Sequence, residues 1–222
     1  MKQKDAKEEI REKIIKAAKV YERYLLGKTF LYVYGESFFE VEFRSNRFLH
    51  LTGVDSKLTA ESFFKDTRRN RLKRGQFYLN KNKGNSFKNA KKKLNCLAVL
   101  PKITNSLVCV LERMHTMTME YTLGLTNLNF TLGLVEDMDA QKNKKSEIFL
   151  PRTIRIKDKS IENSENSDFI DFIFVKESSE RKYKKITFQD KSRLIPSSVH
   201  DKISKSLLEK NLKACKNNFP VK

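Results

Sequence analysis

The stretch Thr29-Phe-Leu-Tyr-Val-Tyr-Gly-Glu-Ser-Phe-Phe-Glu-Val-Glu-Phe43 is typical of a β-hairpin. Residues 29–34 are rich in β-branched and aromatic side chains, and residues 39–43 alternate apolar side chains with glutamates. That alternation is the pattern of a strand with one buried face. The Tyr-Gly-Glu-Ser segment between the two runs has the composition of a tight turn. A hairpin of this kind needs helices or further strands against its apolar face.

Helices are predicted on both sides of this hairpin. Apolar residues from Ile10 to Leu25 recur at three- and four-residue spacing, which predicts an amphipathic helix over residues 8–26 that is ended by Gly27. The short apolar segment 48–51 is expected to continue the sheet or to cap it. Further helices are predicted over residues 58–72, 75–79 and 86–100, the last stopping before Pro101.

Strand patterns dominate the second half of the chain. Helices first and strands later predict an α+β fold, with N-terminal and middle helices packed on a mainly antiparallel sheet of four to six strands. We divide the 222 residues into a single domain, 1–190, and a basic C-terminal tail, 191–222, which forms a weak helix or is disordered. The predicted strands cover residues 106–111, 118–125, 129–135, 147–156, 169–175 and 185–188, with polar loops at 136–146 and 157–167.

The charge of the chain indicates a polyanionic partner. Lys and Arg total 46 against 27 Asp and Glu, which gives a formal net charge of +19. Much of this excess lies in the basic helical segment 58–102, where apolar residues interleave with the cations as in folded helices with one basic face. Such a face would bind a nucleic-acid backbone, with RNA as the first candidate, although a solvated lysine face gives the same pattern. The predicted nucleic-acid-binding residues are Arg44, Arg47, Arg68, Arg69, Arg71, Lys73, Arg74, Lys88, Lys91, Lys92, Lys93 and Arg152.

The sequence lacks the motifs of several classes of enzyme and metal-binding protein. The sequence has no Gly-rich nucleotide-binding motif, no HExxH zinc motif and no GxSxG motif. Its three widely spaced cysteines indicate neither a disulfide framework nor a zinc site. The acidic cluster Glu136-Asp-Met-Asp139 is expected to be a solvated loop. No apolar run approaches the length of a membrane span, so we expect a cytoplasmic protein without membrane contact, metal or cofactor.

A candidate catalytic stretch follows the hairpin directly. Arg44-Ser-Asn-Arg-Phe-Leu-His-Leu-Thr-Gly-Val54 combines a histidine, two arginines and a threonine hydroxyl. Metal-independent RNA cleavage needs a proton-transfer group and cations for the phosphate. His50 is the acid or base candidate, with Thr52 to orient an oxygen, while a hydrogen-bonded structural histidine is the simpler alternative. The candidate phosphate ligands are Arg44, Arg47, Arg152 and Arg155, and Lys176 is a further cation or proton donor.

The chain resembles the phage-associated nuclease domains of the barnase–EndoU–colicin–RelE type, and specifically the fourth family of that phage group. The resemblance spans about residues 25–190. It is carried by Leu31-Tyr-Val-Tyr-Gly-Glu-Ser-Phe-Phe-Glu-Val-Glu-Phe43, Asn46-Arg-Phe-Leu-His-Leu-Thr-Gly-Val54, Leu123-Gly-Leu-Thr-Asn-Leu-Asn-Phe-Thr-Leu132, Phe149-Leu-Pro-Arg-Thr-Ile-Arg155 and Phe169-Ile-Asp-Phe-Ile-Phe174.

The resemblance implies helices on a four- or five-stranded antiparallel sheet and a metal-independent ribonuclease of a phage or mobile element. It also implies a shared site of a strand-borne histidine, a basic residue and a Ser or Thr. His50 and Thr52 match the first part of that pattern, and Arg155 and Lys176 match the later basic positions. The very basic segment 81–93 and the C-terminal tail depart from it.

Three functions are therefore open at the level of sequence. The first is an endoribonuclease that cleaves through a 2′,3′-cyclic phosphate with His50 as acid or base. The second is a non-catalytic nucleic-acid- or ribonucleoprotein-binding effector, such as an anti-CRISPR protein. The third is a toxin whose basic face is covered by an acidic antitoxin.

Overall fold

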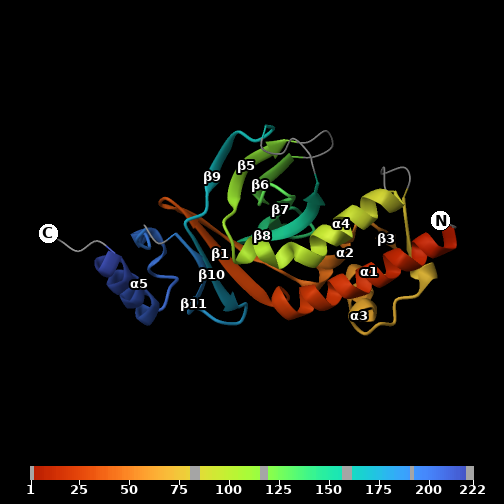
Figure 1. The fold of residues 1–222 in the computed structure, drawn as a ribbon, viewed down its shortest axis with the longest axis horizontal. Coiled ribbons are helices and arrows are strands. Elements are labelled where there is room, and N and C mark those ends of the chain that lie inside the picture. The colour runs from red at the N-terminus through yellow and green to blue at the C-terminus, as the bar shows by residue number, and fades with distance from the viewer. Residues whose placement is uncertain (1–2, 81–85, 116–119, 157–161, 191–192, 219–222) are drawn as a thin grey trace.

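The hairpin predicted from the sequence lies at the centre of a large α+β fold (Figure 1). The computed structural model describes residues 3–80, 86–115, 120–156, 162–190 and 193–218. The helices are α1 (Gln3–Tyr24), α2 (Phe48–Thr52), α3 (Ala60–Arg68), α4 (Phe87–Val99) and α5 (Lys205–Asn218). The strands are β1 (Lys28–Tyr34), β2 (Ser37–Glu42), β3 (Asp55–Ser56), β4 (Phe77–Tyr78), β5 (Cys109–His115), β6 (Glu120–Thr126), β7 (Thr131–Met138), β8 (Lys144–Arg155), β9 (Asn166–Phe169), β10 (Phe172–Glu177) and β11 (Lys185–Gln189).

The main sheet has nine strands in the order β11-β10-β1-β2-β8-β7-β6-β5-β9, so it is larger than the predicted four to six. It is mixed, because two antiparallel groups join where β2 pairs parallel with β8. That junction is only two residue pairs long, Glu40 with Ile148 and Val41 with Phe149. The sheet is strongly curved, since the Tyr34 hydroxyl in β1 donates to Glu112 in β5, 2.9 Å away, although four other strands lie between them.

Helices α1, α3 and α4 lie on one face of this sheet and enclose the main core (Figure 1). The apolar stripe of α1 is buried as its periodicity predicts, and Gly27 adopts a left-handed φ of 72° just beyond it. Thr59 and Ser86 cap α3 and α4 by accepting backbone N–H bonds from the first turn. These local signals explain why the three predicted helices form.

Several sequence predictions in this region are wrong in detail. Segment 48–51 is not a strand but belongs to α2, because Phe48 and Leu51 are buried three residues apart and Gly53 ends the helix with a φ of 77°. No helix forms at 75–79, where a 3₁₀ turn (Arg74–Gln76) leads into the short strand β4. The predicted loop 136–146 is mostly strand, since β7 and β8 both extend into it. Lys81, Lys83 and the start of the predicted strand at Thr118 lie outside the described residues.

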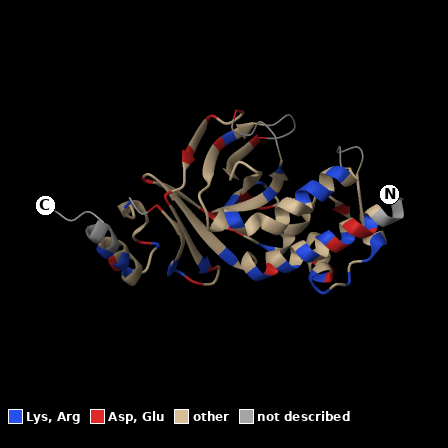
Figure 2. Ribbon diagram, viewed as in Figure 1, with Lys and Arg blue, Asp and Glu red and all other residues tan. Residues whose placement is uncertain are grey.

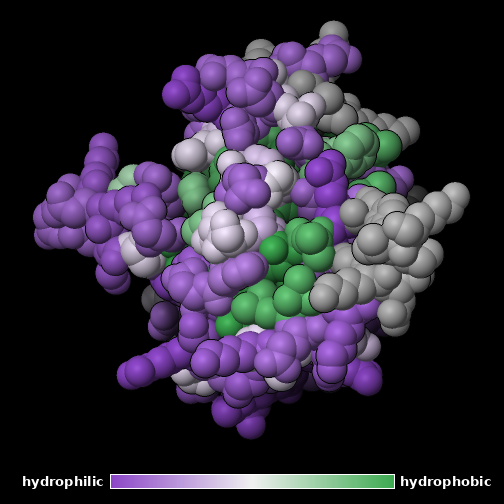
Figure 3. All heavy atoms as spheres, turned by 90° about the vertical axis from the view of Figure 1, so that its left-hand side faces the viewer, coloured by the Kyte–Doolittle hydropathy of each residue, from purple (hydrophilic) through white to green (hydrophobic). Residues whose placement is uncertain are grey.

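The other face of the sheet carries a second core built with the C-terminal segment. Ile195, Val199 and Ile203 are buried there against strands β1 and β10. Glu40 ties this segment to the sheet, because its carboxylate accepts hydrogen bonds from Tyr183 at 2.5 Å and Lys202 at 3.1 Å. Figure 3 views the molecule from this end and shows an apolar area within a largely hydrophilic surface. The chain beyond residue 190 therefore contributes buried side chains to the fold.

Candidate functional site

His50 lies on the outward side of α2, a helix that is too short to form without its neighbours. Phe48 and Leu51 fix α2 to the core, and α2 packs against α4 and β8. This leaves the His50 imidazole exposed. Arg152 of β8 reaches across to it, with its guanidinium nitrogen 3.4 Å from both ring nitrogens. The structure thus brings together two candidates that lie about a hundred residues apart in the sequence.

A β-bulge in β8 directs Arg152 out of the regular ladder. Leu134 of β7 pairs with Pro151 and the preceding Gly133 pairs with Thr153, so Arg152 is the extra residue without a partner in β7. A bulge inserts one residue, bends the strand and re-aims its side chain. Pro151 suits this position because it has no backbone N–H to donate to a ladder. The direction of Arg152 toward His50 is therefore set by the backbone.

Arg47 adds a second, half-buried guanidinium to this surface. It lies in the 3₁₀ turn Ser45–Arg47 just before α2, and its Nε is buried without a hydrogen-bond partner. Burial, followed by the charges of Arg152 and Arg44, lowers the pKa of Arg47 from its ordinary value. Arg44 is held differently, because it forms ion pairs with Glu42 at 2.6 Å and Asp137 at 2.9 Å. The guanidinium of Arg44 is therefore occupied by two carboxylates. The Nε–H of Arg47, in contrast, has no hydrogen-bond acceptor among the described residues.

Lys93 of α4 lies beside the C-terminal end of α2. Its side chain crosses Gly53, where an added Cβ would lie 2.9 Å from Lys93 Cδ. Burial, and after it the charge of Arg155, lowers the pKa of the Lys93 ammonium group. A glycine at position 53 thus allows the left-handed backbone at the end of α2 and leaves room for the Lys93 side chain.

The turn before α2 and strand β8 therefore bring two guanidinium groups, Arg47 and Arg152, into the region of His50. Like charges at close range disfavour each other unless an anion lies among them. No ion pair joins Arg47 or Arg152 to a carboxylate in the part of the chain that the structure describes. The arrangement suits a phosphate group, which offers several acceptor oxygens to guanidinium donors.

Two other predicted catalytic residues lie apart from this group. Thr52 is fully buried, donates its hydroxyl to the Leu49 carbonyl at 2.7 Å and accepts from the Val54 N–H. Lys176 lies on the opposite face of the sheet, 4.0 Å from Glu40 and 4.8 Å from the centre of the Tyr183 ring. Neither side chain shares the surface of His50 and Arg152.

The basic helical segment is partly neutralised by acids of α1. Arg68 pairs with Glu22 at 2.5 Å, Lys91 pairs with Glu9 at 2.6 Å, and Arg74 pairs with Glu8. Figure 2 shows this mixture of red and blue along α1 and the blue of the neighbouring segments. The exposed members of the predicted set that form no ion pair within the described residues are Arg69, Arg71, Lys73, Lys88 and Lys92.

Sequence reasoning named Arg152 both as a nucleic-acid-binding residue and as a candidate phosphate ligand, but it did not predict the contact of Arg152 with His50. The order Leu-Pro-Arg-Thr in β8 could have predicted the bulge at Arg152, because a proline within a strand indicates a bulge. The α1 carboxylates that pair with the basic segment were also missed, although their spacing places them on the face toward α3 and α4. In the acidic cluster, Asp137 pairs with Arg44 and Asp139 accepts from the Asn143 N–H at 2.8 Å.

Comparison with known proteins gives one match. A protein-family model described as phage-Barnase-EndoU-ColicinE5/D-RelE like nuclease4 matches residues 13–192. No curated protein and no solved structure matches the chain. None of the helices in the described ranges has the length and apolar character needed to cross a membrane.

Proposed function

We propose that this chain, which belongs to the phage-Barnase-EndoU-ColicinE5/D-RelE like family of phage nucleases, cleaves RNA without a metal ion. The family membership makes nucleic acid the substrate class. The observation that carries the more specific proposal is the 3.4 Å contact between Arg152 and His50, formed at a β-bulge. Arg47 lies close enough to Arg152 for their charges to interact. This group contains a proton-transfer side chain and phosphate-binding cations.

In the proposed reaction the ribose 2′-oxygen attacks the adjacent phosphorus, and the bond from phosphorus to the 5′-oxygen breaks. His50 accepts the 2′-hydroxyl proton, since a neutral imidazole nitrogen can act as a general base. Arg152 and Arg47 neutralise the charge that grows on the phosphorane oxygens. Lys93, as an ammonium group, donates the proton that the leaving 5′-oxygen requires. The products are a 2′,3′-cyclic phosphate and a 5′-hydroxyl.

The remaining predicted residues have supporting roles in this proposal. Thr52 holds the end of α2 through its bonds to neighbouring backbone, and Arg155 contributes positive charge near Lys93. Lys176 acts at a distance from the reaction, as part of the Glu40 contact with the C-terminal segment. The exposed cations Arg69, Lys88 and their neighbours hold the RNA backbone without reading its sequence. Binding should therefore weaken steeply as salt is added.

The test compares variants of two residues that touch in the proposed site. Wild type, His50→Ala and Arg152→Ala are incubated with total RNA in EDTA, with Arg113→Ala as a matched control for the loss of an exposed strand arginine. Both site variants should lose cleavage by about a hundredfold or more while their melting temperatures stay close to that of wild type. Cleavage by His50→Ala at the wild-type rate would remove His50 from the mechanism.

A second candidate is a non-catalytic effector that binds RNA or a ribonucleoprotein, such as an anti-CRISPR protein. The exposed cations of α4 and of the segment after α3 favour it, because they lie outside the His50 group and need no reaction to bind a backbone. An acidic protein partner such as an antitoxin would use the same face. Charge reversal at Lys88 and Lys92 should abolish the activity of an effector, whereas His50→Ala should leave it intact.

A further inference from the structure

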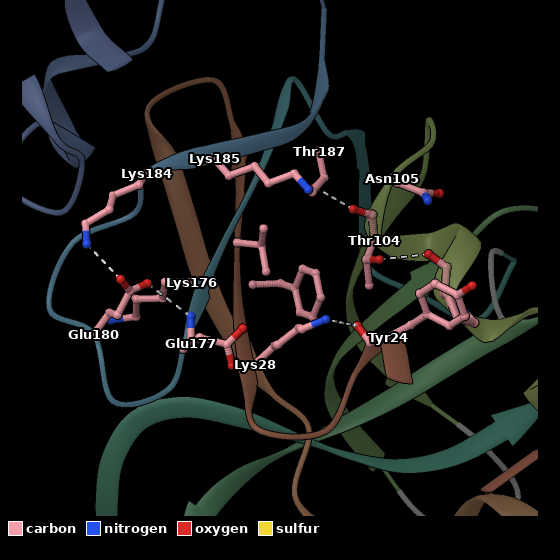
Figure 4. A pocket seen from close by; sticks show the side chains of 13 residues that line it. Tyr24, Lys28, Thr104, Asn105, Lys176, Glu177, Glu180, Lys184, Lys185 and Thr187 are labelled. Carbon is pink, nitrogen blue, oxygen red and sulfur yellow. Dashed lines mark hydrogen bonds and ion pairs between the residues drawn. The ribbon is translucent and has the colours of Figure 1, made fainter. Parts of the chain in front are cut away.

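A hollow lies where the end of α1 meets strands β1, β10 and β11. Its volume is about 360 Å³, which is within the range of small-molecule sites. Figure 4 shows the side chains that line it, and none of them belongs to the group around His50. Any ligand in this hollow would therefore bind independently of the proposed cleavage centre.

The hollow combines an apolar floor with an exposed aromatic ring. Phe30 and Val175 form the floor, and Phe30 is almost fully buried. Tyr24 stands at the wall with 45% of its surface exposed, which is unusual for so large a side chain. The guanidinium carbon of Arg23 lies 5.1 Å from the centre of the Tyr24 ring, so one side of the ring already carries a cation–π contact. A flat apolar group can stack against the remainder of this ring.

Two lysine ammonium groups are available to an anion in this hollow. Lys28 is fixed in place, because its Nζ donates to the carbonyls of Arg23 and Tyr24 at 3.3 Å each. Lys185 enters from β11 and forms no ion pair within the described part of the chain. In Figure 4 these two lysines lie on opposite sides of the hollow. The other two lysines are engaged, Lys184 with Glu180 at 2.7 Å and Lys176 with Glu40.

The rim also offers groups that form directional hydrogen bonds. Asn105 supplies an amide, which both donates and accepts, and Glu177 supplies a carboxylate. A bare phosphate ion would leave the aromatic ring and the carboxylate unused. A fatty acid would leave the amide and the carboxylate unused. A nucleotide uses all of them, because it has a planar base with donors and acceptors on its edge and a phosphate at some distance from the base.

We propose that this hollow binds one nucleoside monophosphate unit, with the base against Tyr24 and the phosphate near Lys28 or Lys185. The unit can come from a free nucleotide or from an RNA strand. In the first case the hollow is an effector site. In the second case it binds a part of the RNA strand that lies outside the cleavage centre. The inference goes beyond the proposed function, since binding here requires no reaction at His50.

The test measures binding and not cleavage, so its outcome is separate from that of the ribonuclease assay. Adenosine 5′-monophosphate and a short RNA oligomer with 2′-O-methyl riboses, which cannot be attacked, are titrated by calorimetry. The variants are Tyr24→Ala, which removes the ring, and Lys185→Glu, which reverses a charge. Lys210→Glu on α5 is the matched control for the charge change, and Arg152→Ala tests the His50 surface.

Tyr24→Ala should weaken binding of at least one probe by about tenfold or more, because stacking of a base on an aromatic side chain is worth that much. Lys185→Glu should also weaken binding by about tenfold or more, because it places a negative charge near the phosphate. Lys210→Glu should leave this binding within about twofold of wild type. Sensitivity of the mononucleotide marks a free-nucleotide site, and sensitivity of the oligomer alone marks a strand site. Absence of binding to folded wild type, equal effects of Lys185→Glu and Lys210→Glu, or loss only in Arg152→Ala would overturn the proposal.

Discussion

Replacement of Gly53 by alanine should damage both the end of α2 and the position of Lys93. Gly53 has a φ of 77°, and an alanine Cβ there would lie 2.9 Å from Lys93 Cδ and 3.4 Å from Ala90 Cα. A residue with a Cβ in the left-handed region costs about 1–2 kcal/mol. The close contact adds little to this cost, because the end of a lysine side chain can move aside. That movement, however, carries the Lys93 ammonium group away from the proposed reacting phosphate.

The expected loss of stability corresponds to a small fall in melting temperature. For a chain of 222 residues, about 1–2 kcal/mol lowers the melting temperature by about 2–8 °C. RNA cleavage should fall more than this loss explains when it is measured at a temperature where the variant is fully folded. The assay is therefore a thermal melt followed by a cleavage rate on the same preparation.

Two other glycines provide controls that separate the two effects. Gly35 has a φ of 52° with no atom within 4 Å of its Cβ position, so Gly35→Ala should show the loss of stability with normal cleavage. Gly75 has neither a positive φ nor a close contact, so Gly75→Ala should change neither quantity appreciably. The reasoning is refuted if Gly53→Ala is as stable as Gly75→Ala, or if it cleaves RNA as well as Gly35→Ala does.

Three further substitutions test the charges of the fold. Lys93→Met should slow cleavage but raise the free energy of unfolding at neutral pH, because burial lowers the pKa of Lys93 in the folded chain. This gain in stability should vanish above the unfolded pKa of lysine, about 10.5, and urea titrations at several pH values measure it. Asp137→Asn should destabilise the protein at neutral pH, since Arg44 holds the pKa of Asp137 below its usual value despite burial, and the difference from wild type should shrink as the pH falls through that lowered pKa. Glu40→Gln should cost about 1–3 kcal/mol by weakening a charged hydrogen bond from Tyr183, and limited proteolysis should then cut the C-terminal segment faster.

Local sequence signals predicted those parts of the fold that depend on neighbouring residues. The hairpin and the apolar stripe of α1 both follow from side chains within a few positions of each other. Segment 48–51 was misjudged because a short apolar run fits either a strand or a helix. The segment is helical because Phe48 packs against α1 and α3. Such long-range contacts cannot be inferred from the neighbouring sequence.

Long-range features could not be predicted in the same way. The joining of two antiparallel groups into nine strands rests on two residue pairs between β2 and β8, which are about a hundred residues apart in the chain. The approach of Arg152 to His50 depends on a bulge whose effect appears only when β7 is beside β8. The resemblance to phage nucleases, in contrast, is confirmed over residues 13–192. The catalytic assignments within that family remain predictions.

The central claim is that the chain cleaves RNA by attack of the 2′-hydroxyl, with His50 and Arg152 at the reacting phosphate. The most direct measurement is the chemistry of the RNA ends formed by wild-type protein in EDTA. The account predicts 2′,3′-cyclic phosphates and 5′-hydroxyls, and no such ends with RNA that carries 2′-O-methyl riboses. Intact RNA, or ends with 5′-phosphates, would contradict it.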